Sequence, residues 1–275
     1  ANFSHSVLNQ FKSQIEFEFD KKLIKFEKIF CTSTPRRIVL LLEGLVDKGE
    51  DEMIIRKGPK ASSAFINGTP TKAAVGFANS LGIDVDDLEI ENTEKGGFVF
   101  GKKVRKGEST RLSLSLIIPK VIKSLQGPRF MKWGNGNFKF SRPIRWLVSI
   151  YNDEILDFNL DECDPKIVVG NLSKSHRLID RVIEINSPDN YFEILAENGV
   201  LVKREERKEK IMNFINQSSE SLNLKPDLSE ELINELSDLV EFPNVITGKF
   251  DEEFLDLPVE VLSMVMKSHQ RYIPL

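Results

Sequence analysis

The apolar stretch Arg37-Ile-Val-Leu-Leu-Leu42 gives the first indication of the fold. It is too short and too rich in β-branched residues to form a buried helix by itself, so it predicts a core strand. Upstream of it, apolar side chains recur every three or four positions, at Leu8, Phe11, Ile15, Phe19 and Leu23. That spacing predicts an amphipathic helix. A helix and a strand in succession favour a fold in which both kinds of element share one core.

Strand and helix signals continue to alternate as far as about residue 186. Strand-forming runs bounded by turn residues predict a strand at 52–56, a hairpin at 89–104 that turns at Lys95-Gly96-Gly97, and a hairpin of strands 144–151 and 155–160 around Asn152-Asp153. Capping signals predict a helix opened by Thr69-Pro70 and closed by Gly82, and a helix from Ser109 to about Leu125 with a kink at Pro119.

The remainder of the chain is predicted to be mainly helical. Caps and apolar spacing indicate helices from Ser187 to Gly199 and over 204–222, 228–239 and 258–267, with one short strand at 244–247. We therefore assign the chain to the α+β class. The predicted domains are a mixed domain at 1–186 and a mainly helical continuation at 187–275.

Composition indicates a globular chain with no general attraction to nucleic acid. Of the 275 residues, 40% are hydrophobic and 29% are charged, which is ordinary for one large domain or two smaller ones. The net charge is −4, so an RNA contact would require a local basic patch. Cys31 and Cys163 form no CxxC pair, and no apolar run is long enough to span a bilayer. We expect a cytoplasmic protein, and we expect both ends to be cut from a longer chain.

No motif predicts a metal or nucleotide site. The histidines His5, His176 and His269 have no cysteine or carboxylate beside them in ligand spacing. The chain also contains no Walker A motif, no GxSxG motif and no dinucleotide-binding fingerprint. We therefore expect no catalytic residue, no metal and no cofactor in this chain.

The segment 128–146 interleaves cations with aromatic rings. The cations are Arg129, Lys132, Lys139, Arg142 and Arg145, and the rings include Trp133 and Trp146. Cations fix phosphates and flat rings stack on bases, so this composition is typical of a contact with single-stranded RNA. We predict that Arg129, Lys132, Arg142 and Arg145 face RNA while the two tryptophans pack beneath them. The alternative is a structured loop whose charges merely face water.

Two further polar segments have alternative interpretations. Ser173-Lys-Ser-His-Arg177 sets an imidazole beside two hydroxyls, so Ser173, Ser175 and His176 are candidates for a hydrolytic pocket. No carboxylate is placed to orient the imidazole, which favours a structural histidine instead. The segment 203–210 alternates charge along a helix, a pattern usual for a solvated face.

Thirteen short motifs resemble, in order, those of the glycyl-tRNA synthetase β-subunit family. They are Thr34-Pro-Arg-Arg37, Lys57-Gly-Pro59, Gly68-Thr-Pro-Thr71, Ala73-Ala74, Gly76-Phe-Ala78, Met131-Lys-Trp-Gly134, Phe140-Ser-Arg-Pro143 with Trp146, Ser175-His-Arg177, Leu239-Val-Glu-Phe-Pro243, Gly248-Lys-Phe250, Phe254-Leu255, Leu257-Pro258 and His269-Gln-Arg-Tyr272. Each motif is weak alone, but the collinear set is specific. One departure is Ile273, where the family is expected to have Phe.

The resemblance implies a role in a two-subunit glycine–tRNA ligase, generally an α2β2 heterotetramer. In this family the α subunit carries the class II site for ATP, with Mg²⁺, and glycine. The β subunit is needed for tRNA(Gly) binding and aminoacylation. The matching region resembles the B3/B4 module of the phenylalanyl enzyme, and HD-like and anticodon-binding domains are expected beyond Leu275.

Three functional interpretations remain open at this point. The chain is expected to support tRNA binding beside a catalytic α subunit, without contacting DNA or a membrane. The first alternative is an editing hydrolase like other B3/B4 modules, and the second is a purely structural module for subunit interaction.

Overall fold

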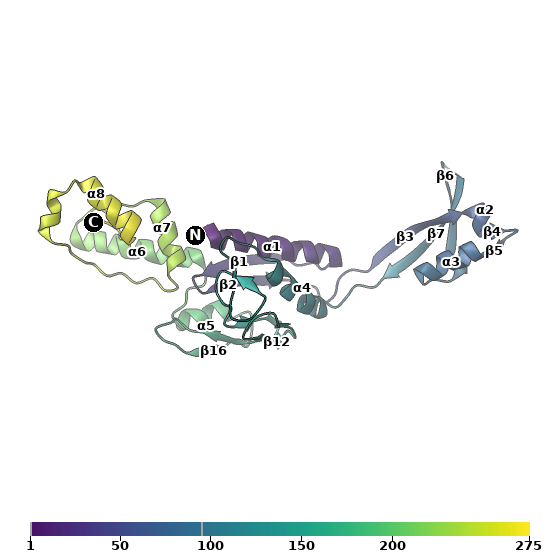
Figure 1. Cartoon of the computed structure of the whole chain (residues 1–275), viewed down its shortest axis with the longest axis horizontal. Coiled ribbons are helices and arrows are strands. Elements are labelled where there is room, and N and C mark those ends of the chain that lie inside the picture. The colour runs from purple at the N-terminus through teal and green to yellow at the C-terminus, as the bar shows by residue number, and fades with distance from the viewer. Residues whose placement is uncertain (1, 95) are drawn as a thin grey trace. The chain divides into compact units, whose positions relative to one another are not determined.

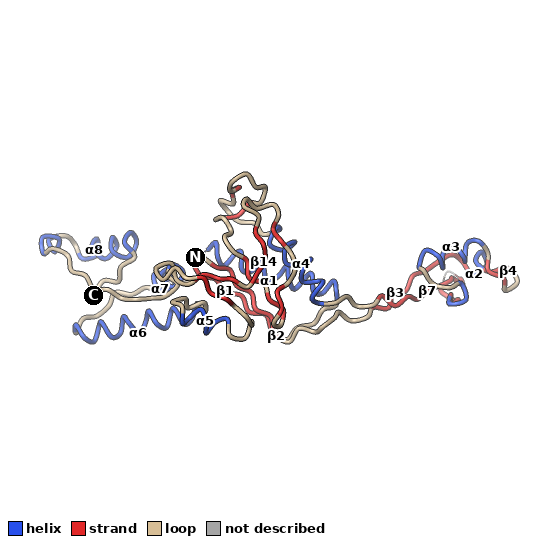
Figure 2. The backbone as a smooth tube through the Cα atoms, turned by 90° about the horizontal axis from the view of Figure 1, so that it is seen from below, coloured by secondary structure: helices blue, strands red, loops and turns tan. Residues whose placement is uncertain are grey.

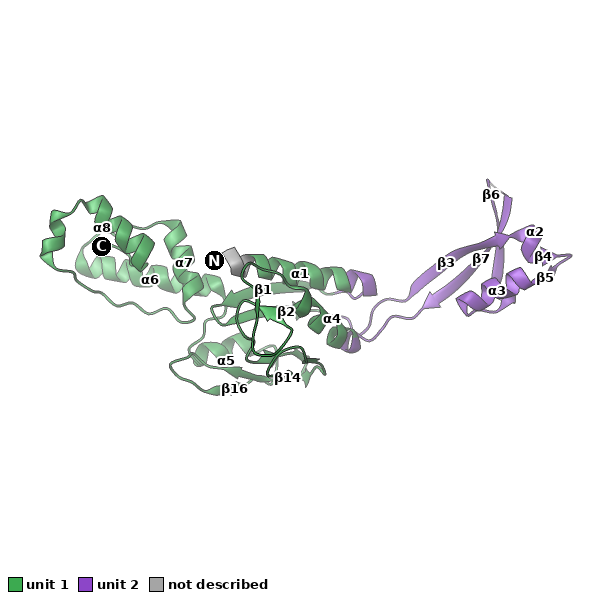
Figure 3. Cartoon of the chain, in the orientation of Figure 1, with its two compact units in different colours: residues 1–18, 26–44, 113–275 green, residues 19–25, 45–112 purple. Residues whose placement is uncertain are grey.

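The computed structural model describes residues 2–94 and 96–275 and has the predicted α+β character. The chain divides into two compact units (Figure 3). Unit 1 holds the chain up to Glu18 together with residues 26–44 and 113–275, and unit 2 holds residues 19–25 and 45–112. None of the described helices is long and apolar enough to cross a membrane.

The predicted helix and core strand begin the chain. Helix α1 spans Asn2–Lys22, and its buried residues are Val7, Phe11, Ile15 and Phe19. The predicted strand is β2, Arg37–Glu43, which pairs antiparallel with β1, Lys28–Thr34, along its whole length (Figure 2). The tight turn between them, Pro35-Arg36, places Thr34 directly opposite Arg37.

Helix α4 and several short strands complete the mixed part of unit 1. Helix α4 is Thr110–Ser124 and contains Pro119. The strands are β8 (Met131–Lys132), β9 (Lys139–Phe140), β10 (Leu147–Val148), β11 (Ile150–Tyr151), β12 (Glu154–Ile155), β13 (Asn159–Leu160), β14 (Ile167–Gly170), β15 (Leu172–Lys174) and β16 (Val182–Glu184).

The predicted hairpin around Asn152-Asp153 is correct only next to its turn. Strands β11 and β12 pair there as predicted. The flanking residues pair instead with β14, which lies between β10 and β13. Because β14 satisfies backbone groups on both of these strands, the two arms of the predicted hairpin separate beyond the turn.

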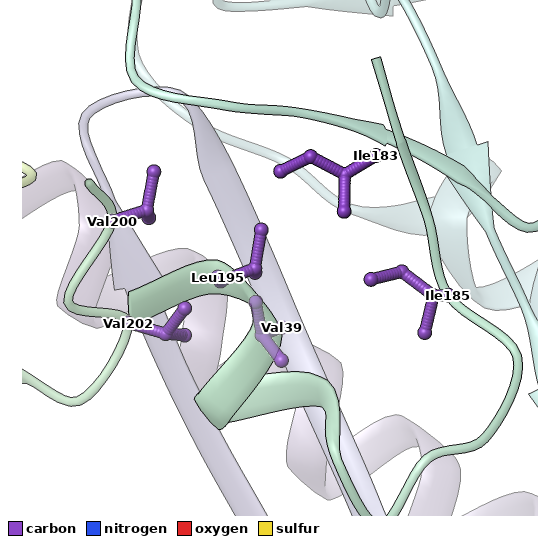
Figure 4. Packing of buried hydrophobic residues seen from close by; sticks show 6 residues of the cluster. All are labelled: Val39, Ile183, Ile185, Leu195, Val200 and Val202. Carbon is purple, nitrogen blue, oxygen red and sulfur yellow. The ribbon is translucent and has the colours of Figure 1, made fainter. Parts of the chain in front are cut away.

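One core cluster of unit 1 draws on residues from both sides of residue 186. Figure 4 shows its six buried side chains: Val39, Ile183, Ile185, Leu195, Val200 and Val202. They come from β2, from the end of the mixed region, from helix α5 (Tyr191–Glu197) and from the segment that follows α5. The predicted domain boundary at 186 stays a prediction.

The end of the chain is mainly helical, as predicted (Figure 1). It contains α6 (Arg204–Leu222), α7 (Glu230–Leu239), η2 (Glu252–Asp256), α8 (Val259–Val265) and η3 (Met266–Gln270). The predicted strand at 244–247 is wrong, because these residues are irregular. The Asn244 side-chain oxygen accepts the Val245 backbone N–H at 2.9 Å, which replaces a bond that a strand would make to its neighbour.

Unit 2 is a three-stranded antiparallel sheet with a helix against it. The sheet order is β3 (Glu52–Lys60), β7 (Gly96–Arg105) and β6 (Leu88–Thr93). The other elements are α2 (Ala61–Ala64), β4 (Phe65–Ile66), β5 (Thr69–Pro70), α3 (Lys72–Leu81) and η1 (Val85–Asp87). The β6–β7 hairpin confirms the one predicted at 89–104, and Lys95 of its turn lies outside the described residues.

The helix predicted to open at Thr69 begins later. Thr69-Pro70 pairs with Phe65-Ile66, and the N-cap is Thr71, whose hydroxyl accepts from Ala73 N at 3.3 Å. Both Thr69 and Thr71 can act as the N-cap of this helix, and the strand pairing of Thr69 leaves Thr71 as the cap. Gly82 ends the helix at φ +68°, as predicted.

Candidate nucleic-acid interface

The aromatic residues of 128–146 pack around a short hairpin. Strands β8 and β9 pair Met131 with Phe140 and Lys132 with Lys139. The Trp133 indole N–H donates to the Phe140 carbonyl at 3.0 Å. The ring of Phe140 lies 4.9 Å from that of Phe130 and 5.8 Å from that of Phe138, centroid to centroid. These rings therefore contact one another and support the loop from inside.

Two glycines allow the hairpin tip to lie against residues 162–164. A Cβ atom on Gly136 would lie 2.6 Å from the Glu162 carbonyl oxygen, and Gly134 has φ +60°. The tip is fixed there by two bonds: Asn135 N donates to the Asp164 carboxylate at 2.8 Å, and Asn137 N donates to the Glu162 carbonyl at 2.9 Å. A side chain on Gly136 would separate the two backbones.

The cations of this segment are exposed and few acids oppose them. Arg129, Lys132, Lys139, Arg142 and Arg145 are all exposed, and 128–146 contains no Asp or Glu. Within the described residues no ion pair joins any of the five to an acid, although Lys132 donates to the Asn137 side chain at 2.8 Å. Both Trp133 and Trp146 are half-buried. The RNA-facing role of Arg129, Lys132, Arg142 and Arg145 stays a prediction.

Trp146 connects this segment to the turn between β1 and β2. The guanidinium carbons of Arg36 and Arg37 lie 5.5 and 5.4 Å from its ring centroid, within the range of a cation–π contact. Arg36 also donates to the Ser175 carbonyl at 3.3 Å. Three segments that are distant in sequence therefore meet at one point.

A buried acid holds that meeting point together. Glu241 is 5% exposed, and it pairs with Arg37 and accepts from the Thr34 hydroxyl at 2.6 Å. Arg37 in turn donates to the Lys174 carbonyl. Sequence reasoning did not identify Glu241 as important. Its only signal was its place within Leu239-Val-Glu-Phe-Pro243, one of the segments that carry the family resemblance.

Arg207 corrects the prediction of a solvated face at 203–210. It is fully buried, and its guanidinium donates to the carbonyls of Ser33 at 2.8 Å, Leu201 at 2.7 Å, Val202 at 2.8 Å and Ser237 at 2.8 Å. Burial lowers the pKa of Arg207. The alternating charges gave no indication of this, because two of the four carbonyls come from β1 and α7, which lie elsewhere in the sequence.

Ser173, Ser175 and His176 lie on and just after β15. The Ser175 hydroxyl accepts from Arg181 N at 2.7 Å, and the His176 Nδ1 atom accepts from Leu178 N at 3.4 Å. The buried Ser173 hydroxyl has no partner among the described residues. The Ser175 and His176 side chains therefore close the 175–181 loop, and no bond between a hydroxyl and the imidazole is formed within the described residues.

Within the described residues, neither a pocket nor a metal-ligand cluster lies at Ser173, Ser175 and His176. The helical end has two open concavities, one lined by residues that include Glu205 and Met212 and the other by residues that include Asp227 and Met264. Neither is lined by Ser173, Ser175 or His176. Within residues 2–94 and 96–275, no group of three or more His, Cys, Asp or Glu side chains is placed to hold a metal ion.

Comparison with known proteins gives one consistent result. The family model for the glycyl-tRNA synthetase beta subunit matches residues 1–275. The chain is 42% identical over 275 residues to the glycine–tRNA ligase beta subunit of Trichodesmium erythraeum, covering all of this chain and 38% of the relative. It is 38% identical to that of Acaryochloris marina and 37% identical to that of Clostridioides difficile, covering all of this chain and 39% and 40% of those relatives.

The chain thus spans about two fifths of the length of the curated relatives it matches. The match extends over both units and includes the segments that meet at Glu241. This chain belongs to the glycyl-tRNA synthetase beta-subunit family.

Proposed function

We propose that this chain is part of the β subunit of a glycine–tRNA ligase and supports tRNA(Gly) binding and aminoacylation beside a separate catalytic α subunit. The observation that carries this proposal is the family match along the entire chain. In the α2β2 assembly implied by the resemblance, the enzyme is an ATP-dependent ligase of the cytoplasm.

The proposal divides the chemistry between the two subunits. The resemblance implies that ATP, Mg²⁺ and glycine bind the α subunit, and this chain contains no Walker A motif or dinucleotide fingerprint that would hold phosphates. The portion described here is not catalytic by itself. Purified alone, it is expected to show no glycine-dependent pyrophosphate exchange above a protein-free control, and exchange above that control would contradict this division.

We assign the contribution to RNA binding to residues 128–146, the segment that contains the β8–β9 hairpin. Arg129, Lys132, Arg142 and Arg145 are exposed and have no acid paired with them among the described residues. The ring packing and the contacts of the loop tip hold their backbone in place, which lowers the ordering cost of binding. Cations in such an arrangement attract phosphates locally even though the net charge is −4, because screening acts over ~8 Å at physiological salt.

The test uses the full α and β subunits together. Arg129, Lys132 and Arg145 are replaced jointly by Ala, and tRNA(Gly) affinity is measured across a salt series. Each lost phosphate contact lowers the slope of log K against log salt by roughly 0.7–0.9, so three contacts give a loss of about 2–3. Aminoacylation at subsaturating tRNA should fall in parallel.

Two controls make the result specific. Replacing Lys225 and Lys249, which are exposed cations of the helical end, should leave the slope unchanged. An unchanged slope in the triple variant contradicts the RNA role of the hairpin. Equal aminoacylation by the α subunit with and without β would contradict the proposed function as a whole.

A further inference from the structure

The loop 175–181 forms a second basic surface, separate from the cations of 128–146 that are assigned to RNA binding. Arg177 and Arg181 are exposed, and the Leu178 side chain between them is 82% exposed. Neither arginine forms an ion pair within the described residues, and Asp180 is the only acid between 172 and 181. This loop therefore presents positive charge to solvent without serving the core.

Hydrogen bonds hold the loop in one conformation. Ser175 N donates to the Arg181 carbonyl at 2.9 Å, and Arg181 N donates back to the Ser175 hydroxyl at 2.7 Å. His176 N donates to the Asn198 carbonyl at 3.0 Å, which fixes the loop to the end of α5. At Gly199, with φ +74°, a Cβ atom would lie only 3.1 Å from that of His176. The exposed arginines therefore extend from a preorganised backbone.

The fold links this loop to the segment that carries Arg142 and Arg145. The Arg36 guanidinium lies 5.5 Å from the Trp146 ring centroid and donates to the Ser175 carbonyl at 3.3 Å. Arg145 immediately precedes Trp146. Arg177 follows Ser175 by two residues, at most ~7 Å of backbone. The two basic segments are thus joined through a single side chain.

The acid beneath this junction does not cancel the surface charge. Glu241 is 5% exposed and already pairs with Arg37, so its charge is compensated inside the protein. Arg36, whose side chain is 28% exposed, also lies 3.7 Å from the Glu241 carboxylate, so two arginines share one acid and the junction keeps a net positive charge. Charge complementarity therefore favours a polyanion as the partner of this surface.

We propose that Arg177 and Arg181 form one continuous phosphate-binding surface with Arg142 and Arg145, and that this surface binds the phosphodiester backbone of the tRNA. The inference rests on the proposed function, because it extends the RNA contact of the hairpin. Arg36, in the β1–β2 turn, acts as a positioning residue that contacts both segments and fixes their relative position.

The experiment measures tRNA(Gly) binding by the αβ holoenzyme across a salt series. The R177A/R181A variant is expected to lower the slope of log K against log salt by about 1.4–1.8, as two lost phosphate contacts require. The R177K/R181K variant should keep most of the slope, because lysine also binds phosphate. The K225A/K249A variant is the charge-matched control and should keep all of it.

The outcomes separate this inference from the proposed function. If R142A/R145A lowers the slope and R177A/R181A does not, the joint surface is wrong while the hairpin contact stands. If R177A/R181A lowers the slope and R142A/R145A does not, the loop binds RNA but the continuous surface is wrong. If neither does, the proposed RNA contact at Arg142 and Arg145 is refuted as well.

Two further readouts exclude indirect effects. Thermal melting should show R177A/R181A folded like the parent, because both side chains are exposed. Sedimentation of α with β should be unaffected. Weakened subunit association with an unchanged salt slope for tRNA would make this loop a protein interface and overturn the inference.

Discussion

Replacing Glu241 by Gln should destabilise unit 1 far more than any surface substitution. The change removes one charge and little volume, and it leaves Arg37, which is 6% exposed, without its acidic partner. Breaking a buried pair by removing one member costs about 3–5 kcal/mol, because the remaining charge is left uncompensated. The amide oxygen still accepts from Thr34, so the loss of charge dominates.

The magnitude can be converted into a measurable shift. For a chain of this size each kcal/mol lowers Tm by about 2–4 °C, so E241Q should melt about 6–20 °C below the parent. Circular dichroism follows the helices. Tryptophan emission in a Trp133→Phe background reports on Trp146, whose ring contacts Arg36 and Arg37. The emission change should coincide with the loss of helix in unit 1.

Two variants test the reasoning behind this value. Asp161→Asn removes the partner of Lys166 in a pair that is 2.6 Å long but 68% and 53% exposed, and it should cost at most ~1 kcal/mol. The double variant R37M/E241L removes both buried charges and should be less destabilised than either single change. A loss for E241Q no larger than for D161N, or a double variant as unstable as the sum of its singles, would refute the argument.

Three other perturbations follow from local contacts. Gly136→Ala should displace the hairpin tip, since its Cβ atom would lie 2.6 Å from the Glu162 carbonyl oxygen. We expect urea unfolding to show a loss of about 1–3 kcal/mol in the free energy of unfolding. Gly248→Ala is the neutral control, because nothing lies within 4 Å of the added Cβ atom. Burial raises the pKa of the Cys31 thiol to about 11. Alkylation of Cys31 should therefore be slow at pH 8 and should accelerate up to pH 11, because the thiolate is the reactive form. An alkylation rate that levels off near pH 9 would contradict this. Hydrogen bonds from Lys106 and from Gly107 N hold the pKa of Asp51 at about 2. The stabilisation of the folded state by ionised Asp51 is therefore present above the unfolded pKa near 3.9 and is lost as pH falls towards 2. Asp51→Asn should accordingly lower the Tm at pH 6 but not at pH 2.

Local elements were predictable from the sequence where local signals agreed. Helix α6 begins and ends at the predicted residues 204 and 222, and β2 occupies the predicted apolar run. In both cases periodicity and flanking residues specify the same element. Where two local signals competed, as at Thr69 and Thr71 or at Asn244, the outcome depended on a pairing or a side-chain bond that periodicity does not reveal.

The candidate site was only partly predictable, because its geometry comes from long-range contacts. The exposure of Arg129, Lys132, Arg142 and Arg145 agrees with the chemistry of the segment, since unpaired cations are costly to bury. The involvement of Arg36 and Arg177 could not be derived in this way. It depends on Trp146 and Ser175 meeting at the β1–β2 turn, and no local pattern encodes that meeting.

The convergence at Glu241 explains why short motifs far apart in the chain occur together. Thr34-Pro-Arg-Arg37 supplies both arginines and the hydroxyl, Ser175-His-Arg177 supplies a carbonyl and the loop, and Leu239-Val-Glu-Phe-Pro243 supplies the acid. Each segment provides a partner that the others need, and a buried charge without its partner is expensive. The same contacts that satisfy these charges also fix the positions of Arg145 and Arg177 on the surface. Stability of the buried pair and placement of the proposed RNA contact are therefore physically coupled, so weakening Glu241 should also weaken tRNA binding at temperatures where the chain is still folded.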